Sequence, residues 1–528
     1  MAKGRIVSVF LAIAVAASHA ALNVDLDSSD SIKTAASAIA ANLWTYYVGN
    51  QPGGTPGILP GPPPGGPYYW WEGGAMWGTL VDYWHFTADA TYNNDTEAAL
   101  TFQANQPDNN YMPPNWTASL GNDDQGFWGM SAMLAAETNF QNPPAGQPQW
   151  LALAQAVFNT QAERWDTASC GGGLRWQIPL SNNGYDYKNT ITAGIFFNIA
   201  ARLARYTANA TYADWAVRTW DWVEAVGYID ADYNVFDGGH VENNCTDINP
   251  AQFSYIAAIF VQGLGFMYNY THGDDVWGNR LRGLTNHTLN YFFPSGIAVE
   301  AACELPNLVQ CTTDMLSFKG YLHRFLAQTT QMAPFTRATI LPVLRSSAQG
   351  MASACDATSG VCGFRWNTGR PDGLVGAGQQ MNALGALVGQ LLALEETSAT
   401  GADKTPLTNA TGGTSVGNSA AGGNPSVDPV ALPITEKDRA GAGILTALVL
   451  VSMVAALLWM SSAANEGPNR WEQDQRAAAA AASARSSVMT RASMLAPLPG
   501  QATGIAVADV SAARKFEHER QPPPQGVA

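Results

Sequence analysis

The stretch HFTADATY at residues 85–92 recurs as RYTANATY at residues 205–212 and, more loosely, as YNYTHGDD at residues 268–275. Each copy follows an apolar segment, precedes a second periodic segment, and holds the small polar residues of a tight turn. Recurrence at roughly 50 to 70 residues is typical of a repeated helical hairpin. The sequence therefore predicts a fold built from such hairpins.

Working outward from these turns, helix-like stretches are separated by Gly, Pro, Asn and Asp clusters, with few strand-like alternations. Twelve such stretches begin near Ser31, Gly73, Asn94, Asp124, Gln149, Thr190, Tyr212, Ala251, Asp275, Thr313, Thr336 and Gly378. Six hairpins suggest an all-α closed toroid with an inner and an outer ring of six helices.

The even-numbered stretches are richer in small and apolar residues, for example GGAM at 73–76, TAGIFF at 192–197, AAIF at 257–260 and ALGAL at 383–387. Such side chains suit a crowded inner ring that is buried all round. The odd-numbered stretches carry more charge, such as Arg280 and Arg282. We therefore expect the even helices to be parallel inner helices, with all their N-termini at one face.

Those six helix starts combine polar groups with aromatic rings, the inventory of a carbohydrate cleft. They hold residues 69–72, 122–125 and 185–189, then Asn249, Gln252, Phe253 and Tyr255, then Asp314, Phe318 and Lys319, and last Gln379 and Gln380. Capping or packing explains any one of these residues taken singly. Their convergence on one face favours a binding site.

One helix start, NDDQGFWG at residues 122–129, holds two adjacent carboxylates. In mid-helix Asp123 and Asp124 would diverge by about 100°, but before regular dihedrals set in both can point into one cavity. Glycosidic bonds are cut by a pair of Asp or Glu side chains. The alternative is helix capping, which Asp favours. The pair Asp274–Asp275 also precedes an apolar helix, and we interpret it as a cap.

We predict Asp123 and Asp124 as catalytic, with an apolar wall at Trp128 or Phe127 that raises the pKa of the acid. The predicted substrate-binding residues are Trp71, Glu72, Gln125, Trp128, Tyr185, Asp186, Lys188, Asn189, Phe253, Phe318 and Lys319. No Cys-x-x-Cys motif or His cluster suggests a metal, and no cofactor is predicted.

The amino-acid composition limits the classes of molecule that this protein can bind. Charged residues are 13% of the chain and the formal net charge is -15, which argues against nucleic acid. The 17 Trp, 18 Tyr and 19 Phe suit stacking on sugar rings, although burial alone also accounts for them. An acidic polysaccharide would need basic residues at the inner helix starts, where only Lys188 and Lys319 occur.

The N-terminus reads as a secretory signal over residues 1–20, with Lys3 and Arg5 before an apolar run and small residues before the cut. The remaining chain then enters an oxidising compartment. Its six cysteines allow fifteen pairings. Cys303–Cys311 and Cys355–Cys362 close short loops, which leaves Cys170–Cys245 as the long-range bridge. Glycosylation sequons occur at Asn94, Asn115, Asn209, Asn244, Asn269, Asn286 and Asn409.

The catalytic domain is expected over residues 21–396, followed by a flexible Ser/Thr/Gly-rich stalk over 397–435. Residues 440–463 carry no charge and are long enough to cross a bilayer. Arg470, Arg476, Arg485 and Arg491 would then face the cytosol in a disordered tail over 464–528. This predicts a single-pass protein with its catalytic domain outside the plasma membrane. A cleaved anchor signal is the alternative.

With those residues in view, the chain resembles the fungal branch of glycoside hydrolase family 76, similar to endo-1,6-α-mannosidases. The resemblance rests on YWWEGGAMW at 69–77, NDDQ at 122–125, GGLRWQ at 172–177, GYDYKNT at 184–190 and SFKGY at 317–321. It implies an (α/α)6 barrel with the adjacent aspartates as catalytic residues. It also implies action on the α-mannosyl core glycan of GPI-anchored proteins, with β-glucan of the cell wall as acceptor.

In the expected retaining mechanism, Asp123 attacks the anomeric carbon and Asp124 protonates the leaving oxygen, but the roles within the pair stay open. Hydrolysis and transglycosylation both fit the pair, because the acceptor depends on how the acceptor subsites bind. The alternative function is a non-catalytic cell-surface glycan-binding protein on the same fold.

Overall fold

The computed structural model describes residues 21–116, 120–304, 310–395, 404–422, 446, 450–456, 458 and 474–480. The chain divides into two units, Met1–Ser426 and Val427–Ala528. The helices described in the first unit are α1 Ser29–Trp44, α2 Trp70–Thr87, α3 Asn93–Gln103, α4 Asn122–Glu137, α5 Trp150–Glu163, α6 Thr190–Thr207, α7 Ala210–Val226, α8 Ser254–Tyr270, α9 Asp275–Phe292, α10 Phe318–Met332, α11 Arg337–Ser353 and α12 Ala377–Glu395. Two short strands, β1 Tyr187–Asn189 and β2 Gly238–His240, pair antiparallel.

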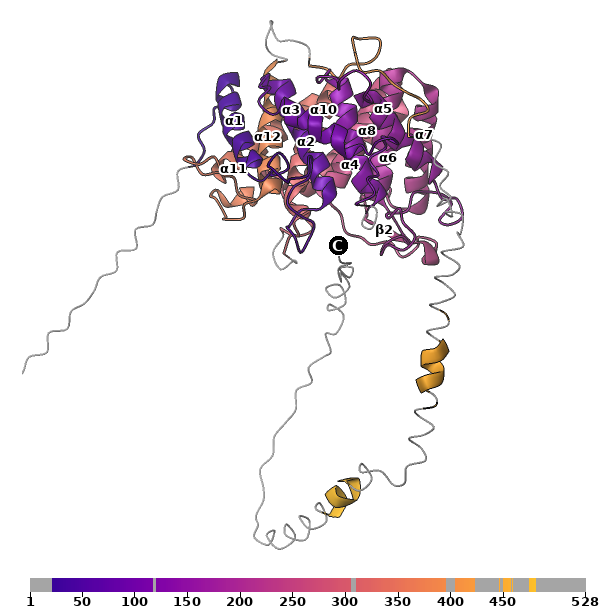
Figure 1. Ribbon diagram of the computed structural model, residues 1–528. Helices are drawn as coiled ribbons and strands as arrows, with labels where there is room; N and C mark the ends of the chain where they lie inside the picture. Colours follow the sequence, from indigo (N-terminus) through magenta and orange to yellow (C-terminus); the bar gives the residue numbers. More distant parts are fainter. Residues whose placement is uncertain are drawn as a thin grey trace, which may run out of the picture. The chain divides into compact units, whose positions relative to one another are not determined.

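The even-numbered helices form a closed ring. Each packs against the next in the order α2, α4, α6, α8, α10, α12, and α12 returns to contact α2. The odd-numbered helices each pack against an even-numbered helix next to them in the chain. Helix α1 also packs against α12, beside which it lies in Figure 1. The predicted barrel of six hairpins is therefore confirmed. The largest difference in a helix start is at α10, which is preceded by the short 3-10 helix η4, Met315–Ser317.

Small residues let the inner helices approach closely, as the sequence predicts. A Cβ atom on Gly194 of α6 would lie 2.9 Å from the ring of Phe260 on α8. A Cβ atom on Gly74 of α2 would lie 2.8 Å from the indole of Trp128 on α4. Both distances are below ordinary carbon–carbon contact, so the large ring on one helix occupies the space that the glycine leaves on the next.

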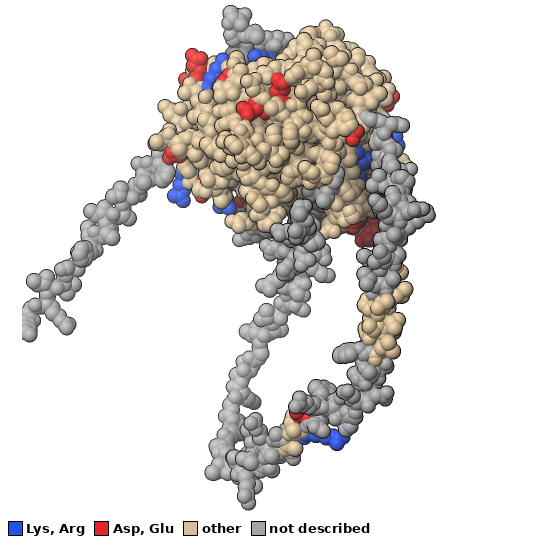
Figure 2. Space-filling view, in the orientation of Figure 1, with Lys and Arg blue, Asp and Glu red and all other residues tan. Residues whose placement is uncertain are grey.

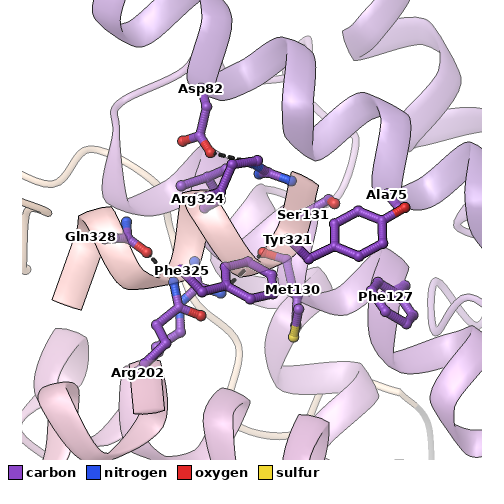
Figure 3. Close-up of a pocket in the computed structure, with 12 residues that line it drawn as sticks. Ala75, Asp82, Phe127, Met130, Ser131, Arg202, Tyr321, Arg324, Phe325 and Gln328 are labelled. Atoms are coloured by element: carbon purple, nitrogen blue, oxygen red, sulfur yellow. Dashed lines mark hydrogen bonds and ion pairs between the residues drawn. The ribbon is translucent and has the colours of Figure 1, made fainter. Parts of the chain in front are cut away.

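The interior of the ring is filled by side chains, with polar groups among the apolar ones (Figure 3). Arg324 Nε lies 2.6 Å from Asp82 Oδ2, and Arg202 Nη2 lies 2.6 Å from Glu137 Oε2. The cavity that remains beside them holds about 20 Å³, which is room for about one water molecule. The interior is therefore a packed core and not an open channel.

The three predicted disulfides are present. Cys303–Cys311 and Cys355–Cys362 join residues 8 and 7 apart, and Cys170–Cys245 joins residues 75 apart. The long-range bridge connects the loop before β1 to the loop after β2, so it holds together the two loops that flank the small sheet.

The surface carries few charges, and the face shown in Figure 2 has acidic and basic side chains scattered over it. Six of the seven sequon asparagines are exposed; Asn269 is half-buried. The Asn269 side chain also accepts a hydrogen bond from Arg205 Nε at 2.7 Å and donates one to the Met332 carbonyl at 3.2 Å.

Residues 404–422, which we call the C-terminal strap, differ from the predicted flexible stalk. Leu407 N donates to the Glu137 carbonyl at the end of α4 at 2.7 Å, and Asn409 N donates to the Tyr206 carbonyl near the end of α6 at 3.0 Å. Ser415 Oγ accepts from Leu151 N at the start of α5. Helix ends leave backbone groups without intrahelical partners. Backbone N–H groups of the strap and the Ser415 hydroxyl supply those partners here, so the stalk prediction is wrong for this segment.

Among the residues that the structure describes, no helix is both long enough and apolar enough to cross a membrane. The predicted span at 440–463 lies mostly outside these residues, as do the predicted signal at 1–20 and most of the tail at 464–528.

Candidate active site

Helix α4 begins against a segment that follows it by about fifty residues in the chain. Asn122 N donates to the Trp176 carbonyl at 2.8 Å, and Asn122 Nδ2 donates to the Arg175 carbonyl at 2.8 Å. Gly121 also forms an isolated antiparallel bridge with Gln177. The start of α4 is therefore fixed to residues 175–177 before its own helical hydrogen bonds begin.

The two aspartates at this start are held by different donors. Asp123 Oδ2 accepts from Trp176 Nε1 at 2.9 Å, and Asp123 Oδ1 accepts from Asp124 N at 3.0 Å. Asp124 Oδ2 accepts from Gly121 N at 2.6 Å. Asp124 thus caps α4 in part, as the alternative interpretation expected. Asp274 shows the pure cap, because Asp274 Oδ1 accepts from the N–H groups of Val276 and Trp277.

The two carboxylates lie close together. A Cβ atom on Gly121 would collide with Asp123 Oδ1 and would lie 2.9 Å from Asp124 Oδ2. Because both oxygens crowd the same point, they lie within about 5 Å of each other. Glycine at residue 121 is therefore a condition for the pair, since any side chain there would displace one carboxylate or both.

Burial shifts the proton affinity of both acids. Burial raises the pKa of Asp123 to about 7, while the N–H groups of Asp124 and Trp176 oppose that rise. Burial and the neighbouring Asp123 charge raise the pKa of Asp124 well above its usual range. Among the described residues neither aspartate has an ion-pair partner, although both are partly exposed to solvent. The pair is thus suited to hold one proton near neutral pH.

Aromatic rings form the wall beside the pair. Trp71 and Phe127 have ring centroids 4.5 Å apart, and Tyr255 stacks on Phe318 at 3.7 Å. Phe253 lies edge-on to Phe318 at 6.0 Å. The predicted residues Trp71, Phe253 and Phe318 therefore come together in one cluster. Trp71 and Phe318 are buried, whereas Phe253 and Tyr255 keep part of their rings exposed, where a sugar can stack.

A further carboxylate, Asp314, belongs to this wall. Trp71 Nε1 donates to Asp314 Oδ1 at 3.2 Å. The Asp314 charge adds to the rise in the pKa of Asp123, Asp124 and Glu72. This residue was noted at a helix start but was not among the predicted site residues.

Eight predicted substrate-binding residues are buried, including Trp71 and Phe318 of the aromatic wall. The other six are Glu72, Gln125, Trp128, Lys188, Asn189 and Lys319. Lys188 Nζ donates to the carbonyls of Asp166, Ser169 and Gly172, and Lys319 Nζ lies 3.0 Å from Glu304 Oε2. We correct the prediction for these six, because their side chains are buried and have no open face for a sugar, although Glu72 Oε1 and Trp128 Nε1 have no hydrogen-bond partner among the described residues.

The other four of these six residues also make contacts within the protein. Glu72 Oε2 accepts from Tyr69 N at the start of α2, and Asn189 caps α6 through Thr192 N. Gln125 Nε2 donates to the Asn110 carbonyl at 2.8 Å. Trp128 is stacked between the rings of Trp70 and Tyr111. Of the two rings predicted as the apolar wall, Phe127 and not Trp128 is the one that packs against Trp71.

Tyr185 and Asp186 lie on the loop that precedes β1, next to the Trp176 segment. Arg175 Nη1 donates to the Tyr185 carbonyl at 3.0 Å, and the Arg175 guanidinium lies 4.6 Å from the centre of the Tyr185 ring. Asp186 is exposed and Tyr185 is half-buried. Their predicted contact with substrate stays a prediction, at the rim of the site.

The sequence interpretation missed Trp176 and Gly121. Trp176 was visible in the motif at 172–177, but nothing in the chain order shows that its indole reaches Asp123. No group of three His, Cys, Asp or Glu in the described part of the chain is arranged to hold a metal ion.

The fold and the site together are those of a glycoside hydrolase built on a helical barrel. The chain belongs to glycosyl hydrolase family 76, whose family model matches residues 31–402.

Several fungal relatives are similar over most of their length. Mannan endo-1,6-alpha-mannosidase DCW1 of Saccharomyces cerevisiae is 46% identical over 445 residues, covering 83% of this chain and 95% of the relative. Mannan endo-1,6-alpha-mannosidase DFG5 of the same yeast is 41% identical over 451 residues, covering 84% and 95%.

Solved structures agree with the fold. The crystal structure of Dfg5 from Chaetomium thermophilum, in complex with glucosamine, has a TM-score of 0.71 at 51% identity and covers 75% of this chain and 97% of that one. The Salegentibacter alpha-1,6-mannanase in complex with alpha-1,6-mannotriose has a TM-score of 0.56 at 16% identity, covering 68% and 99%. The second likeness concerns the fold alone.

Proposed function

We propose that this glycoside hydrolase cleaves α-1,6-linked mannose chains, and that Asp123 and Asp124 perform the chemistry. The observation that carries the proposal is the pair itself. Two adjacent carboxylates lie within about 5 Å of each other, largely desolvated, among the helix N-termini of a closed ring. The names of the DCW1 and DFG5 relatives support α-1,6-mannan as the substrate class.

The hydrogen bonds favour Asp123 as nucleophile. Two N–H donors, from Trp176 and Asp124, stabilise its ionised form. Asp124 stands beside that charge and accepts one backbone N–H, so its proton is the one retained. Asp123 then attacks the anomeric carbon while Asp124 protonates the leaving oxygen. In the second step Asp124 takes a proton from the acceptor, which displaces Asp123 from the sugar.

One oxygen of Asp123 and one of Asp124 lie within about 5 Å of each other, which fits retention of configuration. Retaining glycosidases place their carboxyl groups about 5 to 5.5 Å apart, whereas inverting enzymes need about 6.5 to 9.5 Å to fit a water molecule. A covalent intermediate also admits an acceptor other than water. We therefore include transfer of the α-mannosyl core glycan of GPI-anchored proteins to cell-wall β-glucan in the proposed function.

We place the enzyme at the outer face of the plasma membrane and in the cell wall, with residues 1–20 as secretory signal and 440–463 as membrane span or anchor signal. The three disulfides support an oxidising compartment. Attachment is checked by fractionating cells that express the full chain and its truncation after residue 426.

The function is tested with α-1,6-mannotetraose, with and without a β-glucan oligosaccharide. We expect shorter manno-oligosaccharides, α-configured when first released, and a mass-shifted transfer product when acceptor is present. Proton NMR follows the anomeric configuration and mass spectrometry follows the products. Binding of the tetrasaccharide without any product would support the non-catalytic alternative, and β-configured first product would exclude the retaining mechanism.

A further inference from the structure

An open groove of about 580 Å³ lies beside the Cys170–Cys245 disulfide, apart from the residues of the candidate active site. Helix α7 supplies one wall through Arg218, Asp221 and Trp222. Trp165, the turn at residues 170–171 and the segment 244–246 supply the rest. This volume is within the range of sites that bind small ligands.

The groove combines flat apolar surface with hydrogen-bonding groups. The Arg218 guanidinium lies 5.1 Å from the ring centre of Trp165 and 4.5 Å from that of Trp215. Arg218 is exposed, and among the described residues its guanidinium donates no hydrogen bond. The guanidinium lies over these rings, and its N–H groups are free to donate to the ring and hydroxyl oxygens of a pyranose that enters the groove.

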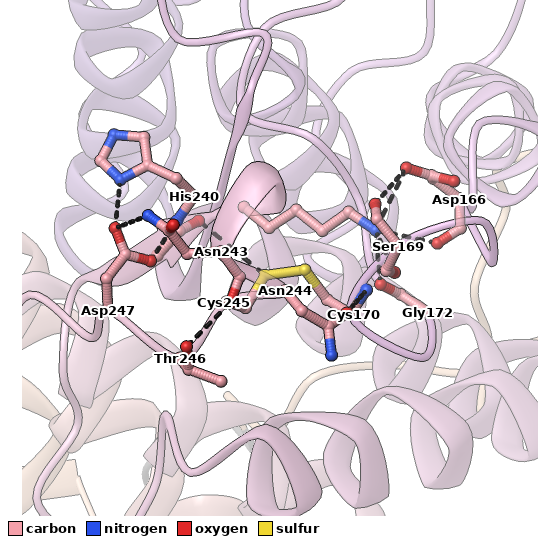
Figure 4. The surroundings of a disulfide bond; sticks show 12 residues. Asp166, Ser169, Cys170, Gly172, His240, Asn243, Asn244, Cys245, Thr246 and Asp247 are labelled. Atoms are coloured by element: carbon pink, nitrogen blue, oxygen red, sulfur yellow. Dashed lines mark hydrogen bonds and ion pairs between the residues drawn. A yellow bond between two sulfur atoms is a disulfide. The ribbon is translucent and has the colours of Figure 1, made fainter.

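Asn244, the asparagine of a glycosylation sequon, lines this groove together with Thr246 of the same sequon. Cys170 N lies 2.8 Å from Asn244 Oδ1 (Figure 4). A backbone N–H can only donate, so the Asn244 atom that faces it must be the oxygen. The Asn244 amide nitrogen therefore points the other way and has no partner among the described residues.

The Asn269 sequon shows the opposite arrangement. Its amide nitrogen donates to the Met332 carbonyl at 3.2 Å and its side chain is half-buried. At Asn244 the hydrogen bond that fixes the side chain uses only the oxygen. The amide nitrogen, which is the atom that N-glycosylation modifies, is therefore free.

We propose that Asn244 carries an N-linked glycan whose first N-acetylglucosamine residues lie in this groove. The inference rests on the secretory route in the proposed function. A lipid-diphosphate-linked oligosaccharide is the donor. The bond between Asn244 Nδ2 and the sugar C1 forms as the C1–O bond to the diphosphate breaks, Nδ2 loses one proton, and the lipid diphosphate leaves.

A tethered sugar needs little intrinsic affinity for the groove. Attachment at the rim gives the glycan a high effective concentration there, so the hydrogen bonds of one guanidinium suffice to keep it in place. The seated sugars cover Trp165 and the turn that carries Cys170.

The test uses the full chain expressed in a yeast host that adds high-mannose glycans. Native protein is digested with endoglycosidase H, which cuts between the first two N-acetylglucosamine residues, and each site is followed by glycopeptide mass spectrometry. We expect Asn244 to be occupied. We expect its release to be about tenfold slower in the native wild type than in native Arg218→Ala. Val217→Ala, an exposed change on the same helix, should release at the wild-type rate.

An empty Asn244 in the secreted protein would overturn the proposal, as would equal release rates in the wild type and Arg218→Ala. Thr246→Ala should remove the Asn244 glycan and Thr246→Ser should keep it, which confirms the assignment of the peptide without disturbing the Asn244 amide. Activity on α-1,6-mannotetraose is measured on the same samples. Protection of Asn244 in an inactive protein would refute the proposed function and leave this inference standing.

Discussion

The two ends of the inner ring treat buried carboxylates in opposite ways. At the helix N-termini, Asp123 and Asp124 share a desolvated space and have no cationic partner among the described residues. Deeper in the ring and toward the helix C-termini, Asp82 and Glu137 are each joined to an arginine at 2.6 Å. Asp123 and Asp124 therefore lack a cation, whereas Asp82 and Glu137 are paired with one, as is Glu304 beside Lys319 at the start of α10.

Helix electrostatics explain where each arrangement is tolerated. The N-terminus of a helix favours negative charge, so backbone N–H groups partly stabilise the front carboxylates. The C-terminal half offers only carbonyls, so a buried acid there needs a cation. Two adjacent acids without a cation at a helix N-terminus favour a catalytic role, whereas the arginine-paired acids near the helix C-termini favour a structural one.

The largest expected effect is on catalysis. Asp123→Asn and Asp124→Asn should each lower kcat by about 10³-fold or more, since each removes a group that reacts directly with the sugar or its leaving oxygen. Asp82→Asn is the matched control at the other end. It should lower the melting temperature and keep kcat per folded molecule within about threefold of wild type. Initial rates on α-1,6-mannotetraose measure these effects. Full activity in Asp123→Asn or Asp124→Asn would remove the catalytic assignment.

A second prediction leaves both acids in place and changes only the space between them. Gly121→Ala should lower kcat by about 10²-fold, because the added methyl would collide with Asp123 and crowd Asp124. Gly389→Ala in α12, where a Cβ atom would lie 3.3 Å from the Ala327 Cβ, tests the same change away from the pair. Rates for both are compared with circular dichroism spectra. Unchanged activity in Gly121→Ala would show that the carboxylates do not need their observed positions.

The third prediction concerns the buried Arg202–Glu137 ion pair near the helix C-termini. Arg202→Met should lower the free energy of unfolding by about 3 to 5 kcal/mol, because it leaves Glu137 charged and buried. The double variant Arg202→Met/Glu137→Leu should recover most of that loss, since an apolar pair of similar volume replaces the ion pair. Denaturant titration measures both. A single variant as stable as wild type would mean that the pair is not structural.

The helical repeat could be predicted from the sequence because its turns recur as local patterns. The Asp pair could be found because its two residues are adjacent. The direction in which a single side chain points could not be predicted from the sequence. Lys188 sits at a predicted inner helix start, yet its ammonium is bound by three carbonyls of residues 166–172 and by the Asp166 carboxylate. A local pattern gives no sign of partners that only the tertiary fold supplies.

Two residues of the site were missed for related reasons. Trp176 reaches Asp123 from a loop fifty-three residues away, a contact that follows from the pairing of residues 175–177 with the start of α4. Gly121 matters because a side chain at this position would collide with the two carboxylates, and a sequence pattern does not show that. The strap was misread because Ser, Thr, Asn and Gly suit both a flexible linker and a segment that caps exposed helix ends.

The smallest expected effect is on how the melting temperature depends on pH. The pKa of Asp123 is raised in the folded protein from 3.8 to about 7, so the native state binds this proton more tightly than the unfolded chain does. Stability linked to this group is therefore complete below about pH 4 and is lost as the pH rises toward 7. Asp123→Asn removes that loss. Its melting temperature should match wild type near pH 4.5 and exceed it by roughly 1 to 3 °C at pH 7.5.

Glu137→Gln supplies the contrast, since it should lower the melting temperature at both pH values by leaving Arg202 without its partner. Differential scanning calorimetry of the three proteins at the two pH values measures the effect. If Asp123→Asn were less stable than wild type at pH 7.5, the ionised front carboxylate would be a stabilising group, and the division between an uncompensated functional end and a paired structural end would not hold.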